Sequence, residues 1–158
     1  MSKATGPIFL VHFRRRREGK TDYVKRLALV KSGRTRLIVR KSNRNMIIQF
    51  IDWNPKGDVT KVHVESLKIK GLAPVVNTQT AYITGFIAGK KAMEKGIKDF
   101  ILDLGLNKSS KANVLYAAVK GVLDSGLKGT VGEEMLPEKA RLEGQHLKKK
   151  ISIQEFVK

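Results

Sequence analysis

Residues 34–52 describe two strands and the turn between them. They read Arg34-Thr35-Arg36-Leu37-Ile38-Val39-Arg40-Lys41, then Ser42-Asn43-Arg44-Asn45, then Met46-Ile47-Ile48-Gln49-Phe50-Ile51-Asp52. Successive side chains of a strand point to opposite faces, so Leu37 and Val39 lie on one face and the three arginines of the first run lie on the other. Asparagine tolerates the left-handed backbone angles of tight turns. The pattern therefore predicts an antiparallel hairpin with one apolar face and one basic face.

The flanking sequence predicts further strands and helices around this hairpin. Thr21 or Asp22 can cap a helix over 23–31, and the turn 54–58 leads into a third strand over 59–65. Later segments predict a helix from Asn77 or Thr78 to about 95, a strand over 100–104, and a helix over 113–124 capped by Ser109 or Ser110. A meander followed by helix, strand and helix predicts an α/β (α+β) fold with the helices packed on one sheet face.

The chain divides into three predicted parts. Residues 1–20 form a basic N-terminal arm without regular structure, 21–130 a globular α/β domain, and 131–158 a tail with a helix over about 136–150.

The helix that starts near residue 78 carries a stripe of small residues, which predicts close packing on the sheet: Ala81, Gly85, Ala88, Gly89 and Ala92.

Positive charge is concentrated at one end of the sequence. The 158 residues carry a formal charge of +18, and residues 1–44 hold 14 Lys+Arg against two acidic residues, a net of +12. Nine of the ten arginines lie in this segment. Arginine presents a rigid fork of donors that matches phosphate, so its segregation indicates a surface that binds a polyanion such as RNA.

The composition excludes several other classes of protein. The chain has no cysteine, so it has no disulfide or thiolate chemistry, and it has no apolar run long enough to span a membrane. Its beginning lacks the order of a signal peptide, which indicates a cytoplasmic protein. The three histidines, His12, His63 and His146, do not pair at helical or strand spacing, so we predict no catalytic residue, metal site or cofactor.

A basic surface of this kind fits a structural protein that stays bound to RNA. The residues alone leave two alternatives to that function open. One is a free-standing RNA chaperone or regulator that uses the same basic face. The other is a nuclease similar to ribonuclease H, whose chemistry needs several carboxylates that hold two metal ions about 4 Å apart. The strand over 34–41 has no carboxylate and Asp103 stands alone on the later strand, which argues against the nuclease.

Five runs of sequence resemble one known family in their order and spacing. They are RRRREGKTDY (14–23), RLIVRKSN (36–43), AYITG (81–85), ILDLGLN (101–107) and AVKGVLDSGL (118–127). Over about residues 5–130 the chain is similar to universal ribosomal protein eighteen of the large subunit, in its archaeal form. The resemblance implies a structural protein of the central protuberance that joins 5S rRNA to the 23S-type rRNA beside neighbouring ribosomal proteins. The tail departs from the longer, more acidic extension of archaeal relatives.

The resemblance and the charge distribution select the same candidate RNA contacts in the first 44 residues. These are Arg14, Arg15, Arg16, Arg17, Lys20, Tyr23, Arg36, Arg40, Lys41, Ser42, Asn43 and Arg44. The arginines are expected to bind phosphates or base edges, Ser42 and Asn43 to bind 2′-hydroxyls, and Tyr23 either to stack on a base or to lie in the core. Weaker candidates follow the later strand, at Asn107, Lys108 and Lys111.

Overall fold

A five-stranded sheet forms the middle layer of the protein, for which the computed structural model describes residues 6–145 and 156. The strands are β1 (Arg36–Lys41), β2 (Met46–Asp52), β3 (Val59–Glu65), β4 (Asp99–Asp103) and β5 (Lys128–Gly129). Their spatial order is β3-β2-β1-β4-β5. The first three pair antiparallel, which confirms the meander, whereas β4 and β5 join in parallel. The two-residue β5 is too short to leave a pattern in the sequence.

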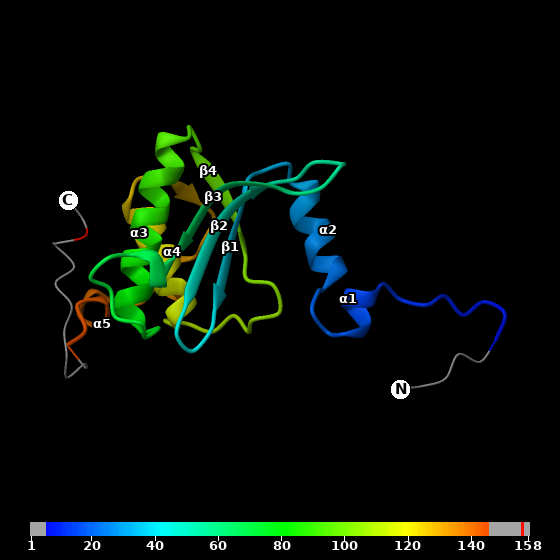
Figure 1. Ribbon diagram of the computed structural model, residues 1–158, viewed down its shortest axis with the longest axis horizontal. Coiled ribbons are helices and arrows are strands. Elements are labelled where there is room, and N and C mark those ends of the chain that lie inside the picture. The colour runs from blue at the N-terminus through cyan, green and yellow to red at the C-terminus, as the bar shows by residue number, and fades with distance from the viewer. Residues whose placement is uncertain (1–5, 146–155, 157–158) are drawn as a thin grey trace.

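The helices are divided between the two faces of this sheet. They are α1 (Arg14–Arg17), α2 (Tyr23–Lys31), α3 (Thr78–Glu94), α4 (Val114–Asp124) and α5 (Lys139–Leu142), with 3-10 turns η1 (Ser66–Lys68) and η2 (Glu133–Met135). As Figure 1 shows, α3 and α4 cover one face, while α1 and α2 lie on the opposite side of β1 and β2. The predicted α+β fold is confirmed, and the helices after the meander share one face as expected.

Side chains at the helix starts explain where the long helices begin. The Asn77 side chain accepts a hydrogen bond from the Thr80 backbone N–H at 2.8 Å, and the Thr80 hydroxyl accepts one from the Asn77 N–H at 2.9 Å. This reciprocal capping box satisfies two backbone donors at the start of α3. The predicted serine cap of α4 is wrong, because Asn113 accepts from the Tyr116 N–H there. Ser109 instead shares a hydrogen bond with the Tyr116 hydroxyl.

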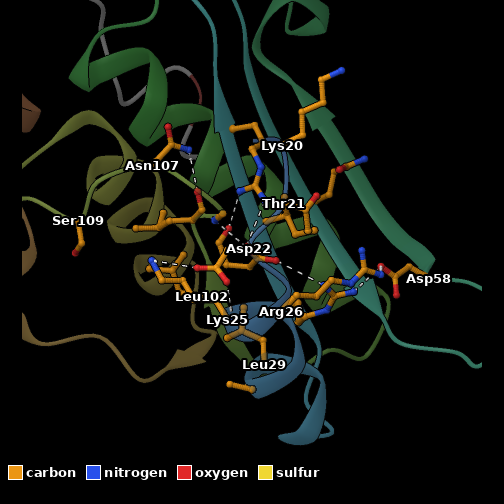
Figure 2. Close-up of a pocket in the computed structure, with 18 of the residues that line it drawn as sticks. Lys20, Thr21, Asp22, Lys25, Arg26, Leu29, Asp58, Leu102, Asn107 and Ser109 are labelled. Carbon is orange, nitrogen blue, oxygen red and sulfur yellow. Dashed lines mark hydrogen bonds and ion pairs between the residues drawn. The ribbon is translucent and has the colours of Figure 1, made fainter. Parts of the chain in front are cut away.

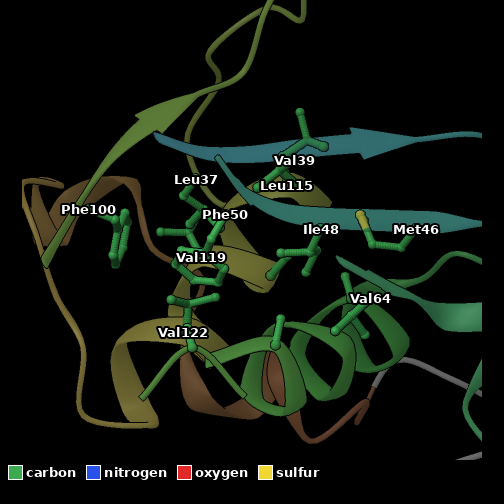
Figure 3. Packing of buried hydrophobic residues seen from close by; sticks show 14 of the residues in the cluster. Leu37, Val39, Met46, Ile48, Phe50, Val64, Phe100, Leu115, Val119 and Val122 are labelled. Atoms are coloured by element: carbon green, nitrogen blue, oxygen red, sulfur yellow. The ribbon is translucent and has the colours of Figure 1, made fainter. Parts of the chain in front are cut away.

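The core lies between the sheet and the α3–α4 pair (Figure 3). Leu37 and Val39 are fully buried, which confirms the apolar face predicted for the first strand. Phe50 on β2 meets Phe100 on β4 edge to face, with the ring centroids 6.2 Å apart. The opposite face of β1, which carries Arg36, Ile38 and Arg40, therefore turns toward α2.

Within the small-residue stripe of α3, the glycines pack against a different neighbour from the one predicted, whereas Ala81, Ala88 and Ala92 belong to the core that α3 shares with the sheet. An ideal Cβ added to Gly85 would lie 2.0 Å from the Ala118 carbonyl oxygen on α4, so this glycine lets the two helices touch through their backbones. Gly121 on α4 meets the Tyr82 carbonyl of α3 in the same way. The Tyr82 hydroxyl donates to Asp124, and burial together with this hydrogen bond raises the pKa of Tyr82 to about 12. The glycines thus pack helix on helix, whereas close packing on the sheet was expected.

Replacing Gly121 with alanine is expected to destabilise the protein by about 1–3 kcal/mol. The new Cβ would lie 2.2 Å from the Tyr82 carbonyl oxygen, and a backbone atom in a helix cannot rotate away. The loss should exceed the roughly 1 kcal/mol that alanine gains over glycine in helix propensity. Urea unfolding measures the difference. Gly132→Ala is the control, because its nearest neighbour, the Glu134 Cγ, is 3.8 Å away; equal stability of the two variants would contradict the packing.

Two terminal elements differ from the prediction. The arm contains one helical turn, Arg14–Arg17, where no regular structure was expected. The long tail helix predicted over 136–150 is wrong in its described part, since α5 spans only Lys139–Leu142; residues 146–150 lie outside the described residues. Gly144 ends it with a φ of +70°, and the Gln79 side chain donates to the Glu143 carbonyl at 2.8 Å. With Leu142 buried in the core, the start of the tail packs on α3.

Candidate nucleic-acid interface

A groove of about 620 Å³ lies between α2 and the sheet face that α3 and α4 leave open. Figure 2 shows side chains of α2, the preceding segment and the β4–α4 loop converging on it. Ile38 and Gln49 of the sheet and Leu29 of α2 contribute to its walls. Among the residues that the structure describes, nine charged ones line it, six of them basic and three acidic: Arg15, Lys20, Lys25, Arg26, Arg36 and Arg40, and Asp22, Asp58 and Asp103. The groove therefore carries an excess of positive charge.

Helix α2 forms the outer wall of the groove without packing into the core. Asp22 caps it by accepting hydrogen bonds from the Val24 and Lys25 backbone N–H groups, which confirms one of the two predicted caps. None of its residues is buried. Among the described residues, the side-chain hydrogen bond or ion pair that ties it to the sheet region is the 2.8 Å pair between Arg26 Nη2 and Asp58 Oδ2. This ion pair holds α2 in place beside the sheet and leaves the groove between them open.

The segment before α2 brings basic side chains to the same groove. Arg15 Nε donates to the Thr21 hydroxyl at 2.8 Å, and the Lys20 backbone N–H donates to the Arg15 carbonyl. These bonds fold the chain back so that Arg15 and Lys20 line the groove. The Tyr23 ring lies against Phe13, with the centroids 5.1 Å apart, and it is partly exposed and lies outside the main core cluster. Arg14, Arg16 and Arg17 are exposed on α1.

Arg36 is buried, contrary to the expectation that the arginine face of β1 is uncovered. Only 2% of its side chain is exposed. Its Nη2 lies 2.7 Å from Asp58 Oδ2 and its Nη1 lies 3.6 Å from Asp103 Oδ2. The Nε–H has no hydrogen-bond partner among the described residues. Alternation assigned the correct face, but the carboxylates of Asp58, in the β2–β3 turn, and Asp103, at the end of β4, cover this arginine.

Arg40, two positions further along the same face, is half-exposed. Its Nη1 donates to the carbonyls of Val39 and Asp103, and its Nη2 donates to the Asp103 carboxylate at 3.3 Å. With 39% of the side chain accessible, the guanidinium reaches the groove while it is anchored from behind. Arg40 therefore keeps the geometry expected of an RNA-binding arginine, whereas Arg36 does not.

The hairpin tip and the β4–α4 loop carry the remaining candidates. Lys41, Ser42, Asn43 and Arg44 are exposed, although the Ser42 hydroxyl already bonds the Asn45 backbone. Asn107 lines the groove and donates to the Leu104 carbonyl. Lys108 is exposed, and Lys111 pairs with Glu134 at 2.8 Å.

The structure gathers some of the predicted candidates in the groove and leaves others outside it. Those that line it are Arg15, Lys20, Arg36, Arg40 and Asn107. Sequence reasoning missed Lys25 and Arg26, although both belong to the basic segment that the charge count singled out. It also missed the roles of Asp58 and Asp103, because an acidic residue carries no signal in a search for an RNA-binding surface.

The open sheet face continues past the groove as a polar row on β2 and β3. Gln49 Nε2 lies 3.0 Å from His63 Nδ1, and His63 Nε2 lies 2.6 Å from a Glu65 carboxylate oxygen. The hydrogen bond from His63, with that from Lys68, lowers the pKa of Glu65 below its ordinary value. His63 is therefore the middle member of a hydrogen-bonded row of side chains at the surface of the sheet. Across the part of the chain that the structure describes, no cluster of acidic or histidine side chains has the makeup of a metal site.

Within residues 6–145 and 156, no helix is long and apolar enough to cross a bilayer.

Comparisons with known proteins agree on one group of relatives. Residues 8–101 match the family described as "Ribosomal large subunit proteins 60S L5, and 50S L18". The large ribosomal subunit protein uL18 of Thermofilum pendens is 45% identical over 147 residues, which cover 91% of this chain and 75% of that protein. Those of Methanobrevibacter smithii and Methanoculleus marisnigri are each 42% identical over 91% of this chain, and cover 76% and 84% of their own lengths.

Proposed function

Because the chain belongs to the uL18 family of ribosomal proteins, we propose that it binds 5S rRNA and attaches it to the large-subunit rRNA in the central protuberance. As a member of this family, it is a structural component of the large subunit in the cytoplasmic ribosome and not an enzyme. The observation that carries the proposal is the basic groove between α2 and the open sheet face. The basic residues that line it all come from residues 1–44, the segment that holds nine of the ten arginines. Phosphate backbones supply the negative charge that such a surface neutralises.

Individual residues take different parts in the proposed contact. Basic side chains that are exposed, or half-exposed in the case of Arg40, bind phosphates on α1, in the groove and at the hairpin tip: Arg14, Arg15, Arg16, Arg17, Lys20, Arg40, Lys41 and Arg44. Asn43 and Ser42 reach ribose hydroxyls, and Tyr23 stacks beside Phe13 on an unpaired base. Asn107, Lys108 and Lys111 are secondary contacts. Arg36, being buried, holds the groove together from within.

The attachment role requires a second RNA-binding surface. The 23S-type rRNA and neighbouring ribosomal proteins are the proposed partners for the surfaces that 5S rRNA leaves accessible. Gel-shift titration with 5S rRNA, beside a shuffled RNA of equal length, tests the first contact. A pull-down of a large-subunit rRNA fragment through immobilised 5S rRNA tests the bridge. Equal affinity for both RNAs would favour a general RNA chaperone and contradict the proposal.

Deletion of residues 1–20 is expected to leave the melting temperature almost unchanged and to weaken 5S rRNA binding substantially. All described residues of this arm, 6–20, are exposed, so their removal uncovers no core. Circular dichroism melts and gel-shift titrations of the two chains measure both effects. A large loss of cooperative unfolding would show that the arm is part of the folded domain.

A further inference from the structure

We propose that Asp103 is a positioning residue for RNA binding, which holds the Arg40 guanidinium by one edge so that its other edge meets an RNA phosphate. The inference rests on the proposed RNA-binding function and deepens it. It assigns a role to an acidic side chain placed within a surface that otherwise gathers positive charge. The geometry around Arg40 carries the argument.

Asp103 binds Arg40 through two oxygens. Its backbone carbonyl accepts from Nη1 at 2.8 Å and its carboxylate Oδ1 accepts from Nη2 at 3.3 Å. A guanidinium has two parallel donor pairs, one along Nη1 and Nη2 and the other along Nη2 and Nε. Since Asp103 engages the first pair, the edge formed by the Nε–H and the second N–H of Nη2 remains for a ligand; the three hydrogen bonds that Arg40 makes to described residues come from Nη1 and from one N–H of Nη2. This second pair has the spacing that matches two phosphate oxygens.

The carboxylate is itself fixed in place. Its Oδ1 also accepts from the Gly105 backbone N–H at 2.8 Å, and only 11% of the side chain is exposed. Gly105 makes room for the guanidinium, because an ideal Cβ there would lie 2.9 Å from Arg40 Cζ. Its φ of +61° is one that glycine adopts without strain. The strand end, the loop and the arginine thus form one preorganised unit.

Charge alone predicts the opposite effect for this residue. A carboxylate beside a phosphate-binding surface repels the ligand, so its removal would strengthen RNA binding if electrostatic attraction were all that mattered. A long arginine side chain left without its anchor, however, samples many rotamers and must be ordered on binding. The sign of the effect of removing Asp103 therefore separates positioning from simple electrostatics.

The test measures 5S rRNA affinity for a small set of full-length variants. Asp103→Ala is expected to weaken binding about tenfold. Asp103→Asn keeps the Oδ1 acceptor and should retain most of the affinity. In an Arg40→Ala background, Asp103→Ala should cause no further loss of RNA affinity, because its effect on binding passes through Arg40. Its 3.6 Å ion pair with buried Arg36 affects stability instead, which urea unfolding of the same variants measures separately. Asp99→Asn, at the other end of β4 and paired with exposed Arg34 at 3.7 Å, removes the same charge as a control and should not weaken binding.

Each outcome decides a separate point. If the wild-type chain fails to prefer 5S rRNA over the shuffled RNA, the proposed function fails and the inference falls with it. If the wild-type chain prefers 5S rRNA but Asp103→Ala binds as tightly or more tightly, the positioning role alone is overturned. An equal loss with and without Arg40 also overturns it. If Asp103→Ala does not fold, Gly105→Ala decides, since it displaces Arg40 and leaves Asp103 in place; unchanged affinity would refute the inference.

Discussion

Raising the salt concentration from 50 to 200 mM is expected to weaken binding to 5S rRNA about a thousandfold. The reason is the net charge of +12 on residues 1–44, of which the groove and α1 present the larger part to solvent. Neutralising about six phosphates releases their condensed counterions, and this entropic gain shrinks as bulk salt rises. Affinity titrations at several salt concentrations give the slope. A nearly flat dependence would contradict an electrostatic interface.

Charge placement can be separated from total charge with matched variants. Replacing Arg14–Arg17 together with glutamine should reduce the salt slope by roughly three to four, if all four arginines contact phosphates. The control replaces four lysines in and just after the last turn of α3, a helix on the other face of the sheet: Lys90, Lys91, Lys95 and Lys98. Both variants lose four charges, so a similar drop in slope for each would show that position does not matter.

Truncation of Arg36 is expected to reduce the stability of the protein, whereas truncation of Arg40 is expected to reduce its affinity for RNA. Arg36→Ala should cost about 3–5 kcal/mol of stability, because it leaves Asp58 and Asp103 without their shared buried cation. Arg40→Ala should cost little stability, since the side chain is 39% exposed, and should instead weaken RNA binding. Both arginines lie on the same face of β1, but only Arg36 is buried. A difference between the two variants therefore shows that burial decides whether an arginine on this face contributes to stability or to RNA binding.

Urea unfolding and 5S rRNA titration of the two variants check this contrast. Arg36→Met, which fills the space without a charge, should recover part of the stability if the loss comes from packing as well as pairing. The reverse pattern, with Arg40→Ala unfolding and Arg36→Ala only binding less well, would mean that the ion pairs around Asp58 and Asp103 do not hold the sheet face together.

The local parts of the fold were predictable because local physics determines them. Two-residue alternation identified Leu37 and Val39 as core, and cap chemistry at Asp22 and Asn77 placed two helix starts. The burial of Arg36 was not predictable in this way. Alternation assigns a side chain to a face but does not report what covers that face, and the covering carboxylates come from Asp58 and Asp103, 22 and 67 residues away.

Helical periodicity has the same limit. It placed Gly85 and Gly89 on one stripe, but not the neighbour against which the stripe packs, which is α4. For the tail, the sequence favoured a helix over about 136–150, yet Gly144, inside that range, adopts a left-handed φ and its backbone packs on Gln79. A tertiary contact therefore ended the helix after Leu142.

Protein–RNA crosslinking with sequencing, on large subunits that contain this protein, tests the central claim most directly. We expect residues 14–44 to crosslink to 5S rRNA, with the strongest signals from α1, the groove and the hairpin tip. Crosslinks of 5S rRNA to the α3–α4 side of the sheet, with residues 14–44 crosslinked to other RNA or to none, would contradict the proposed interface.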